Sequence, residues 1–443
     1  MLGSILLLTV SLFFLIRNNQ KGLIVIVVIS LSNDLFEIPF IGVKHYQFIS
    51  LLFSLKVIRY WINNASFLKK IILPLILEYY YLIILGIILG FIFPWKGDYD
   101  HLRSWSQLSE GRTIVQLVRF LSELALIFFV YYCLHAHKVT IKFIINVISV
   151  IMSIGVLIAL FDSFTNYSIR FTLFNEARFI EGRFLGLNGE PRAFGQICSF
   201  GLLFLVIMKK YINSGLIKYG IISSIIGVIL SFSASTYILT IVWVAVFILF
   251  KIIKLNVLSV IFIFFVLLSV NYLISNNEFV YSDTIRKINI VTGIDMKEHG
   301  IIEKVDANEP NFFSRFEVFD RAALNFLYRN PSYLVTGTGP NLISIPSSPY
   351  LTKTTYSIYG ENIDSVPHSF IINLLSRTGL IGLLLWLVFF MKMYKNQKNN
   401  LPILKAFFVS VFISNFIASS AYFYFYLGII LFLMSNYNKK VYA

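Results

Sequence analysis

Apolar runs long enough to cross a lipid bilayer recur along nearly the whole chain, and this feature limits the possible folds more than any other. A membrane-spanning helix needs about 17 to 25 mostly apolar residues. Runs close to that length are found at residues 2–16, 22–41, 46–62, 71–94, 114–134, 143–163, 193–208, 219–234, 236–252, 256–275, 367–391, 402–418 and 421–436. Only 13% of the residues are charged, whereas about 25% is usual in soluble domains. The sequence therefore predicts one all-α polytopic membrane domain over residues 1–443, with about 13 transmembrane helices in a range of 12 to 14.

The formal net charge of +15 is concentrated in short loops that contain no Asp or Glu. These basic segments are residues 17–21, 59–70, 138–142, 209–218, 251–254, 392–405 and 439–440. Cytoplasmic loops of membrane proteins carry such an excess of Lys and Arg, so we place these segments in the cytoplasm. The positive charge therefore indicates membrane topology, and no nucleic-acid partner is expected.

Three loops on the opposite side are too polar to be simple turns: residues 94–112, residues 165–192 (the Arg-rich loop) and residues 276–366 (the large loop). The large loop is far longer than the usual connection of about 4 to 6 residues, and loops of that length are usually functional. We therefore expect functional residues on the non-cytoplasmic side.

The Arg-rich loop contains four arginines interleaved with three glutamates: Arg170, Arg178, Arg183 and Arg192 alternate with Glu176, Glu181 and Glu190. A guanidinium offers a fixed fork of donors that suits phosphate oxygens, which favours a site for a diphosphate headgroup. The alternative is that these arginines reach the membrane interface and pair with the neighbouring glutamates.

The large loop contains a helix-compatible stretch at residues 316–328, preceded by Arg315 and followed by Gly337-Thr338-Gly339. Glu317 and Arg321 lie one helical turn apart and can be an ordinary surface pair. Arg315 has no partner as obvious as that. The two glycines suggest a close backbone approach, although a plain turn explains them equally well.

The segment where the large loop re-enters the membrane contains Asp364, Pro367 and His368, followed by Arg377 and Gly379. A histidine with an ordinary pKa of about 6.5 can act as a general base near neutral pH. A structural or interfacial histidine is the alternative. The other histidines form no ligand constellation, so neither a metal nor a cofactor is expected.

Arg119 and Glu123 lie four residues apart inside a predicted transmembrane helix. A charge at membrane depth is costly, so such residues are paired or functional. The spacing of one helical turn favours a structural ion pair.

The order of these motifs resembles that of the O-antigen polymerase and O-antigen ligase superfamily of bacterial envelope glycosyltransferases. The matching elements are residues 183–195 with Glu190-Pro191, Arg315 followed by Gly337-Thr338-Gly339, and Pro367-His368-Ser369-Phe370 with Arg377-Thr378-Gly379 and Gly382. Relatives often have a Ser-Arg pair near the end of the eighth span and Asn after the loop histidine. This chain instead has Ser233-Ala234-Ser235-Thr236 and Ser369, so details that come from the ligases transfer less securely.

The resemblance implies a GT-C-type transferase that takes glycan from an undecaprenyl diphosphate carrier at the periplasmic face of the bacterial inner membrane. By the same resemblance, Arg183 and Arg315 would hold the diphosphate and His368 would activate the acceptor hydroxyl. On chemical grounds, Glu190 or Asp364 could serve as that base in place of His368. Further substrate-binding roles would fall to Arg192, Arg321, Glu190, Asp364 and Arg377.

A polymerase that joins lipid-linked oligosaccharide units is the function that we predict. An O-antigen ligase acting on the lipid A core and a flippase for the same lipid-linked sugar are the alternatives. Charges concentrated in external loops, without an inverted repeat, favour a transferase over a transporter. The expected partners are the lipid-linked oligosaccharide and the lipid bilayer, with a chain-length regulator and a flippase as protein partners.

Overall fold

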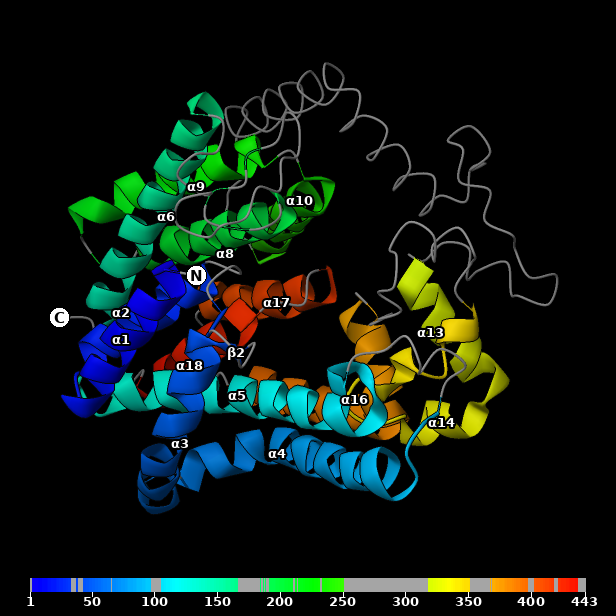
Figure 1. Ribbon diagram of the computed structural model, residues 1–443. Coiled ribbons are helices and arrows are strands. Elements are labelled where there is room, and N and C mark those ends of the chain that lie inside the picture. Colours follow the sequence, from blue (N-terminus) through cyan, green and yellow to red (C-terminus); the bar gives the residue numbers. More distant parts are fainter. Residues whose placement is uncertain are drawn as a thin grey trace, which may run out of the picture.

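The computed structural model describes most of the helical part of the chain (Figure 1). The described residues are 2–32, 37–38, 43–64, 66–96, 105–165, 184, 186, 188, 191–209, 212, 214–231, 233–250, 318–350, 367, 369–396, 402–417 and 421–436.

The elements in chain order are α1 (Leu2–Ile16), α2 (Gln20–Leu31), β1 (Glu37–Ile38), β2 (Val43–Lys44), α3 (His45–Asn64), α4 (Ser66–Gly86), the π-helical turn η1 (Ile87–Ile92), the 3₁₀ turn η3 (Trp105–Gln107), α5 (Ser109–His135), α6 (Ile141–Phe164), α8 (Pro191–Lys209), α9 (Gly215–Leu230), α10 (Ala234–Leu249), α13 (Val318–Arg329), α14 (Pro331–Thr336), the 3₁₀ turns η6 (Leu342–Ser344) and η7 (Ser348–Tyr350), α16 (Phe370–Asn396), α17 (Pro402–Ile417) and α18 (Ala421–Asn436).

The predicted all-α polytopic membrane fold is confirmed. Four helices, Ile71–Ile92, Ser109–His135, Ile141–Asp162 and Phe370–Lys395, are long and apolar enough to cross a membrane, and six shorter apolar helices accompany them among the described residues. The predicted span at residues 256–275 lies outside the described residues. The total of about 13 spans therefore stays a prediction.

The predicted helix at residues 22–41 is wrong in its second half. Helix α2 ends at Leu31, where the Ser32 backbone N–H donates to the Val28 carbonyl. The chain then forms a short antiparallel pair in which Glu37 lies opposite Lys44. Ser32, Asn33 and Asp34 directly follow the helix, and such short polar side chains compete with helical hydrogen bonds by bonding to nearby backbone groups.

The helices form one bundle around a continuous apolar core (Figure 1). Helix α5 packs mainly against α3 and α18, while α4 packs against α16. Helices α13 and α14, which lie within the predicted large loop, pack against α16 beside the ends of α4 and α5. The described part of the large loop is thus docked onto the membrane helices.

Candidate functional site

Helix α16 is interrupted at Gly379, whose φ of +64° and ψ of −163° lie far from helical values. Only glycine adopts this backbone conformation without strain. A Cβ atom at Gly379 would also collide with the Val335 carbonyl oxygen. The break separates an N-terminal segment that begins at Phe370 from the longer remainder of α16.

The Gly337-Thr338-Gly339 turn docks onto this break. Thr338 donates from both its backbone N–H and its hydroxyl to the Ser376 carbonyl, each at 2.7 Å. The Gly339 N–H donates to the Arg377 carbonyl at 3.1 Å. Because a helix end leaves carbonyls without intrahelical partners, the turn satisfies groups at the break.

Close backbone approach explains the glycine that opens this turn. Gly337 has a φ of +83°, and a Cβ atom there would collide with the Arg377 carbonyl group. Two motifs that lie far apart in the sequence therefore interlock in the structure. This interlocked pair of segments, Gly337–Gly339 and Arg377–Gly379, is the centre of the candidate site.

Helix α13 contacts the N-terminal end of α16. The Asp320 carboxylate accepts a hydrogen bond from the Ser369 backbone N–H at 3.0 Å, and the Ser369 carbonyl accepts from the Asn373 N–H at 2.8 Å. A carboxylate at this position also interacts favourably with the positive end of the helix dipole. Arg321, the next residue of α13, is 5% exposed, so this predicted binding residue is held in a packed helix.

Arg377 lies in a buried ion pair that joins α16 to α4. Its Nη2 atom lies 3.1 Å from Oε1 of Glu78, and both side chains are almost fully buried. The guanidinium also lies over the Phe120 ring at 4.7 Å, while the Thr378 hydroxyl donates to Glu78 at 3.4 Å. The protein itself thus supplies the counter-ion of Arg377.

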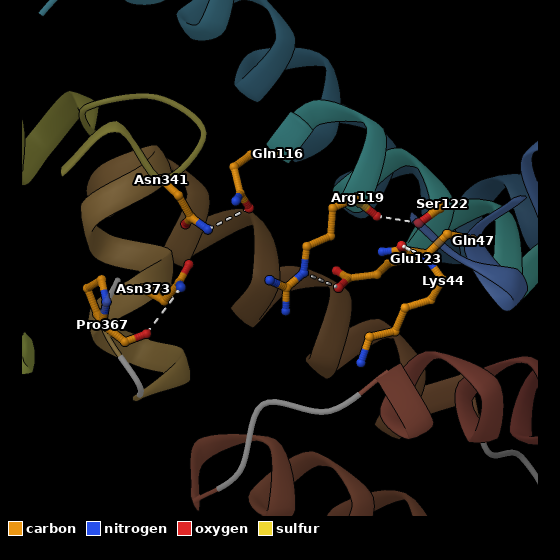
Figure 2. A network of polar contacts seen from close by, with 9 residues as sticks. All are labelled: Lys44, Gln47, Gln116, Arg119, Ser122, Glu123, Asn341, Pro367 and Asn373. Carbon is orange, nitrogen blue, oxygen red and sulfur yellow. Dashed lines mark hydrogen bonds and ion pairs between the residues drawn. The ribbon is translucent and has the colours of Figure 1, made fainter. Parts of the chain in front are cut away.

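Figure 2 shows a second set of polar contacts, which joins α5, the large loop and α16. The Asn341 carboxamide donates to Gln116 of α5 at 2.9 Å, and Asn373 donates to the Pro367 carbonyl at 3.4 Å. One turn further along α5, Nε of Arg119 lies 3.6 Å from Oε1 of Glu123. The predicted Arg119–Glu123 ion pair is therefore confirmed.

The structure describes only part of the predicted site. Arg321 and Arg377 are described with their side chains, and Arg192 lies in the first turn of α8. The remaining predicted residues lie outside the described residues: Arg183, Glu190, Arg315, Asp364 and His368. Their roles stay predictions.

Several residues of the candidate site were not singled out from the sequence. Glu78 carries the same signal as Arg119, because it is a charge within an apolar run, and this signal could have identified it. Gln116 and Asn341 gave no such signal, since isolated carboxamides are common in loops and near helix ends.

We expect the Arg377→Ala variant to unfold at a clearly lower temperature, because it leaves the Glu78 carboxylate buried without its partner. Removal of one member of a buried ion pair typically costs about 3 to 5 kcal/mol. Thermal unfolding of the detergent-purified protein measures the loss. In a double-mutant cycle, adding Glu78→Ala should cost less than it does in the wild-type background. Additive losses would contradict an energetically coupled pair.

Comparison with protein families bears on the same region. Residues 219–387 match the O-antigen ligase family. The match contains Arg315, both interlocked segments and the His368 junction, but not residues 183–195. No curated protein matches the chain. The family match supports the resemblance to the O-antigen ligase and polymerase superfamily, and together with the helical fold it supports a membrane enzyme of glycan assembly.

Proposed function

We propose that this protein polymerises oligosaccharide repeat units carried on undecaprenyl diphosphate, at the periplasmic face of the bacterial inner membrane. The observation that carries the proposal is the interlock of Gly337–Gly339 with Arg377–Gly379 inside the segment that matches the O-antigen ligase family. Because these segments hold each other in place beside the start of α16, motifs shared with a glycan-transferring family form one structural unit.

The reaction is a displacement at the anomeric carbon of the growing chain. A hydroxyl oxygen of the acceptor unit forms the new bond to that carbon and loses its proton to a base. The bond from the anomeric carbon to the diphosphate breaks, and the diphosphate leaves with the electron pair. Negative charge thus develops on the diphosphate, where preorganised arginines stabilise it.

In this proposal Arg183 and Arg315 stabilise the leaving diphosphate, and His368 takes the proton of the acceptor hydroxyl. Arg192 and Arg321 assist in binding, and Glu190 and Asp364 line the same site. Arg377 has a positioning role, because its ion pair with Glu78 holds the N-terminal segment of α16 against α4.

Purified protein in lipid nanodiscs, supplied with repeat units on undecaprenyl diphosphate, tests the function directly. We expect a ladder of polymer lengths and the release of one undecaprenyl diphosphate per linkage. Lipid A core added as a second acceptor should stay unglycosylated. Transfer to the core without a ladder would replace the polymerase with a ligase, and movement of the lipid-linked unit across the bilayer without any transfer would indicate a flippase.

We also expect the large loop to lie in the periplasm, opposite the basic loops. Ser332, at the start of α14, is exposed and suits a Ser332→Cys reporter, whereas Ser347 is buried. Cys133 and Cys198 are both buried and should be replaced before labelling. An impermeant maleimide should label Cys-substituted position 332 in cells with a permeable outer membrane and an intact inner membrane. Labelling that requires a broken inner membrane would contradict this topology.

A further inference from the structure

Arg119 lies on the face of α5 that points into the helix bundle. At about 100° per residue, positions seven and eleven residues further along a helix share its face, and these are Leu126 and Val130, which are fully buried. Ile114, an exposed apolar residue of α5, lies about 140° away from Arg119 around the helix. Arg119 therefore shares its face of α5 with residues of the bundle core.

The Arg119 side chain is nevertheless 51% exposed. Val115, one turn earlier on the same side, is 42% exposed. Tyr46 of α3 and Tyr424 of α18 lie close enough to Arg119 to interact with it, so helices flank the residue. Accessible surface on a side chain that helices flank leaves room beside Arg119 for small polar groups.

The guanidinium of Arg119 also has unused donors. Its ion pair with Glu123 is made through Nε, and it is the only hydrogen bond or ion pair of this guanidinium with the described residues. Figure 2 shows the two terminal nitrogens directed away from Glu123. These terminal nitrogens offer the paired donors that bind phosphate oxygens.

A purely structural ion pair would be fully packed, as the pair of Arg377 and Glu78 is. The side chain of Arg377 is 3% exposed, whereas that of Arg119 is 51% exposed. Arg119 lies ten residues, or about 15 Å, beyond the start of α5 at Ser109. An exposed charge at that depth is costly unless it has a ligand or water to interact with. Arg119 thus has the accessibility of a binding residue.

We propose that Arg119 binds the diphosphate of a second lipid carrier, at a site separate from the one around the external loops. The proposal rests on the proposed function, because a polymerase acts on two carrier-linked substrates and must hold two diphosphates at once. One belongs to the chain that is transferred, and the other belongs to the acceptor unit.

The carboxamides beside Arg119 extend this site toward the external surface. Gln116 is bound to Asn341, and the Oδ1 atoms of Asn341 and Asn373 are buried acceptors that make no hydrogen bond with the described residues. These three side chains come from α5, the large loop and α16, as Figure 2 shows.

Native mass spectrometry of the detergent-purified protein, titrated with undecaprenyl diphosphate, tests the proposal by counting bound lipids. We expect two lipids on the wild-type protein, and at least tenfold weaker binding of one of them to the Arg119→Gln variant. Glu123→Gln breaks the same ion pair but keeps the cation, so it should retain both lipids with equal or higher affinity. Arg17→Gln, the same change at an exposed arginine that lies over Phe13, should also retain both.

The possible results distinguish a failure of the Arg119 site from a failure of the proposed function. Two lipids on Arg119→Gln with unchanged affinity, or equal losses in Arg119→Gln and Glu123→Gln, would overturn the Arg119 site and leave the proposed function standing. One lipid on the wild-type protein would do the same. No lipid on the wild-type protein would count against the proposed function itself. Displacement of the Arg119-dependent lipid by equimolar inorganic pyrophosphate would show that the site takes free anions and not a lipid carrier.

Discussion

Polymer formation should be lost when Arg183 or Arg315 is changed to Ala, while the protein still inserts into the membrane. Each arginine is proposed to stabilise charge that develops on the leaving diphosphate. Removal of one such donor typically costs about 100- to 1,000-fold in rate, and the two should act on the same group. The readout is the polymer ladder on a gel, with membrane insertion followed by immunoblot of the membrane fraction.

Lysine at either position should restore only part of the activity. A guanidinium binds two phosphate oxygens at once, whereas an ammonium is a point charge and cannot reproduce that geometry. Arg178→Ala provides a matched control, because Arg178 lies in the same Arg-rich loop but outside residues 183–195. A normal ladder from the Arg183 or Arg315 variant would refute the assignment, as would an equal loss from Arg178→Ala.

The second large effect is expected at His368. Changing it to Ala or Gln should slow glycosyl transfer by about 100- to 10,000-fold, the usual cost of losing a general base. Binding of the lipid carrier should stay largely intact, because a base acts in the transition state more than in the ground state. The matched measurements are turnover of lipid-linked repeat units and carrier binding by the same purified variant.

The dependence on pH separates a base from a packing residue. A histidine acts as a base only when deprotonated, so the wild-type rate should fall as the pH drops through the ordinary histidine pKa of about 6.5. The His368→Ala variant should lose this decline. If it keeps near wild-type turnover, or shows the same decline, His368 is not the base. The Glu190→Gln and Asp364→Asn variants would then be compared in the same assay.

Hydropathy predicted most of the apolar helices in the part of the chain that the structure describes. The predicted helix at residues 114–134 lies within α5, and that at 421–436 coincides with α18, since long apolar runs have few other ways to satisfy their backbone in a membrane. The predicted helix at 22–41 was wrong beyond Leu31, because the apolar average across that window outweighed Ser32, Asn33 and Asp34 within it.

The break in α16 could not be predicted from local sequence. A single glycine within an apolar run is compatible with a continuous helix, and Gly382, three residues later, lies in one. What distinguishes Gly379 is its contact with Val335 and Gly337, which are remote in the sequence. The two ion pairs differ in the same respect. Arg119–Glu123 could be predicted from helical spacing, whereas Glu78–Arg377 joins two helices that are remote in the sequence.

The break at Gly379 should also affect how α16 responds to the thickness of the surrounding bilayer. Helices adjust to a thinner or thicker hydrocarbon layer by tilting, at a cost of a fraction of a kcal/mol per Å. We expect the tilt of the longer segment of α16 to be absorbed at Gly379, since the N-terminal segment is held by hydrogen bonds from Thr338 and Gly339. The N-terminal end of the helix should then keep its position as the membrane composition changes.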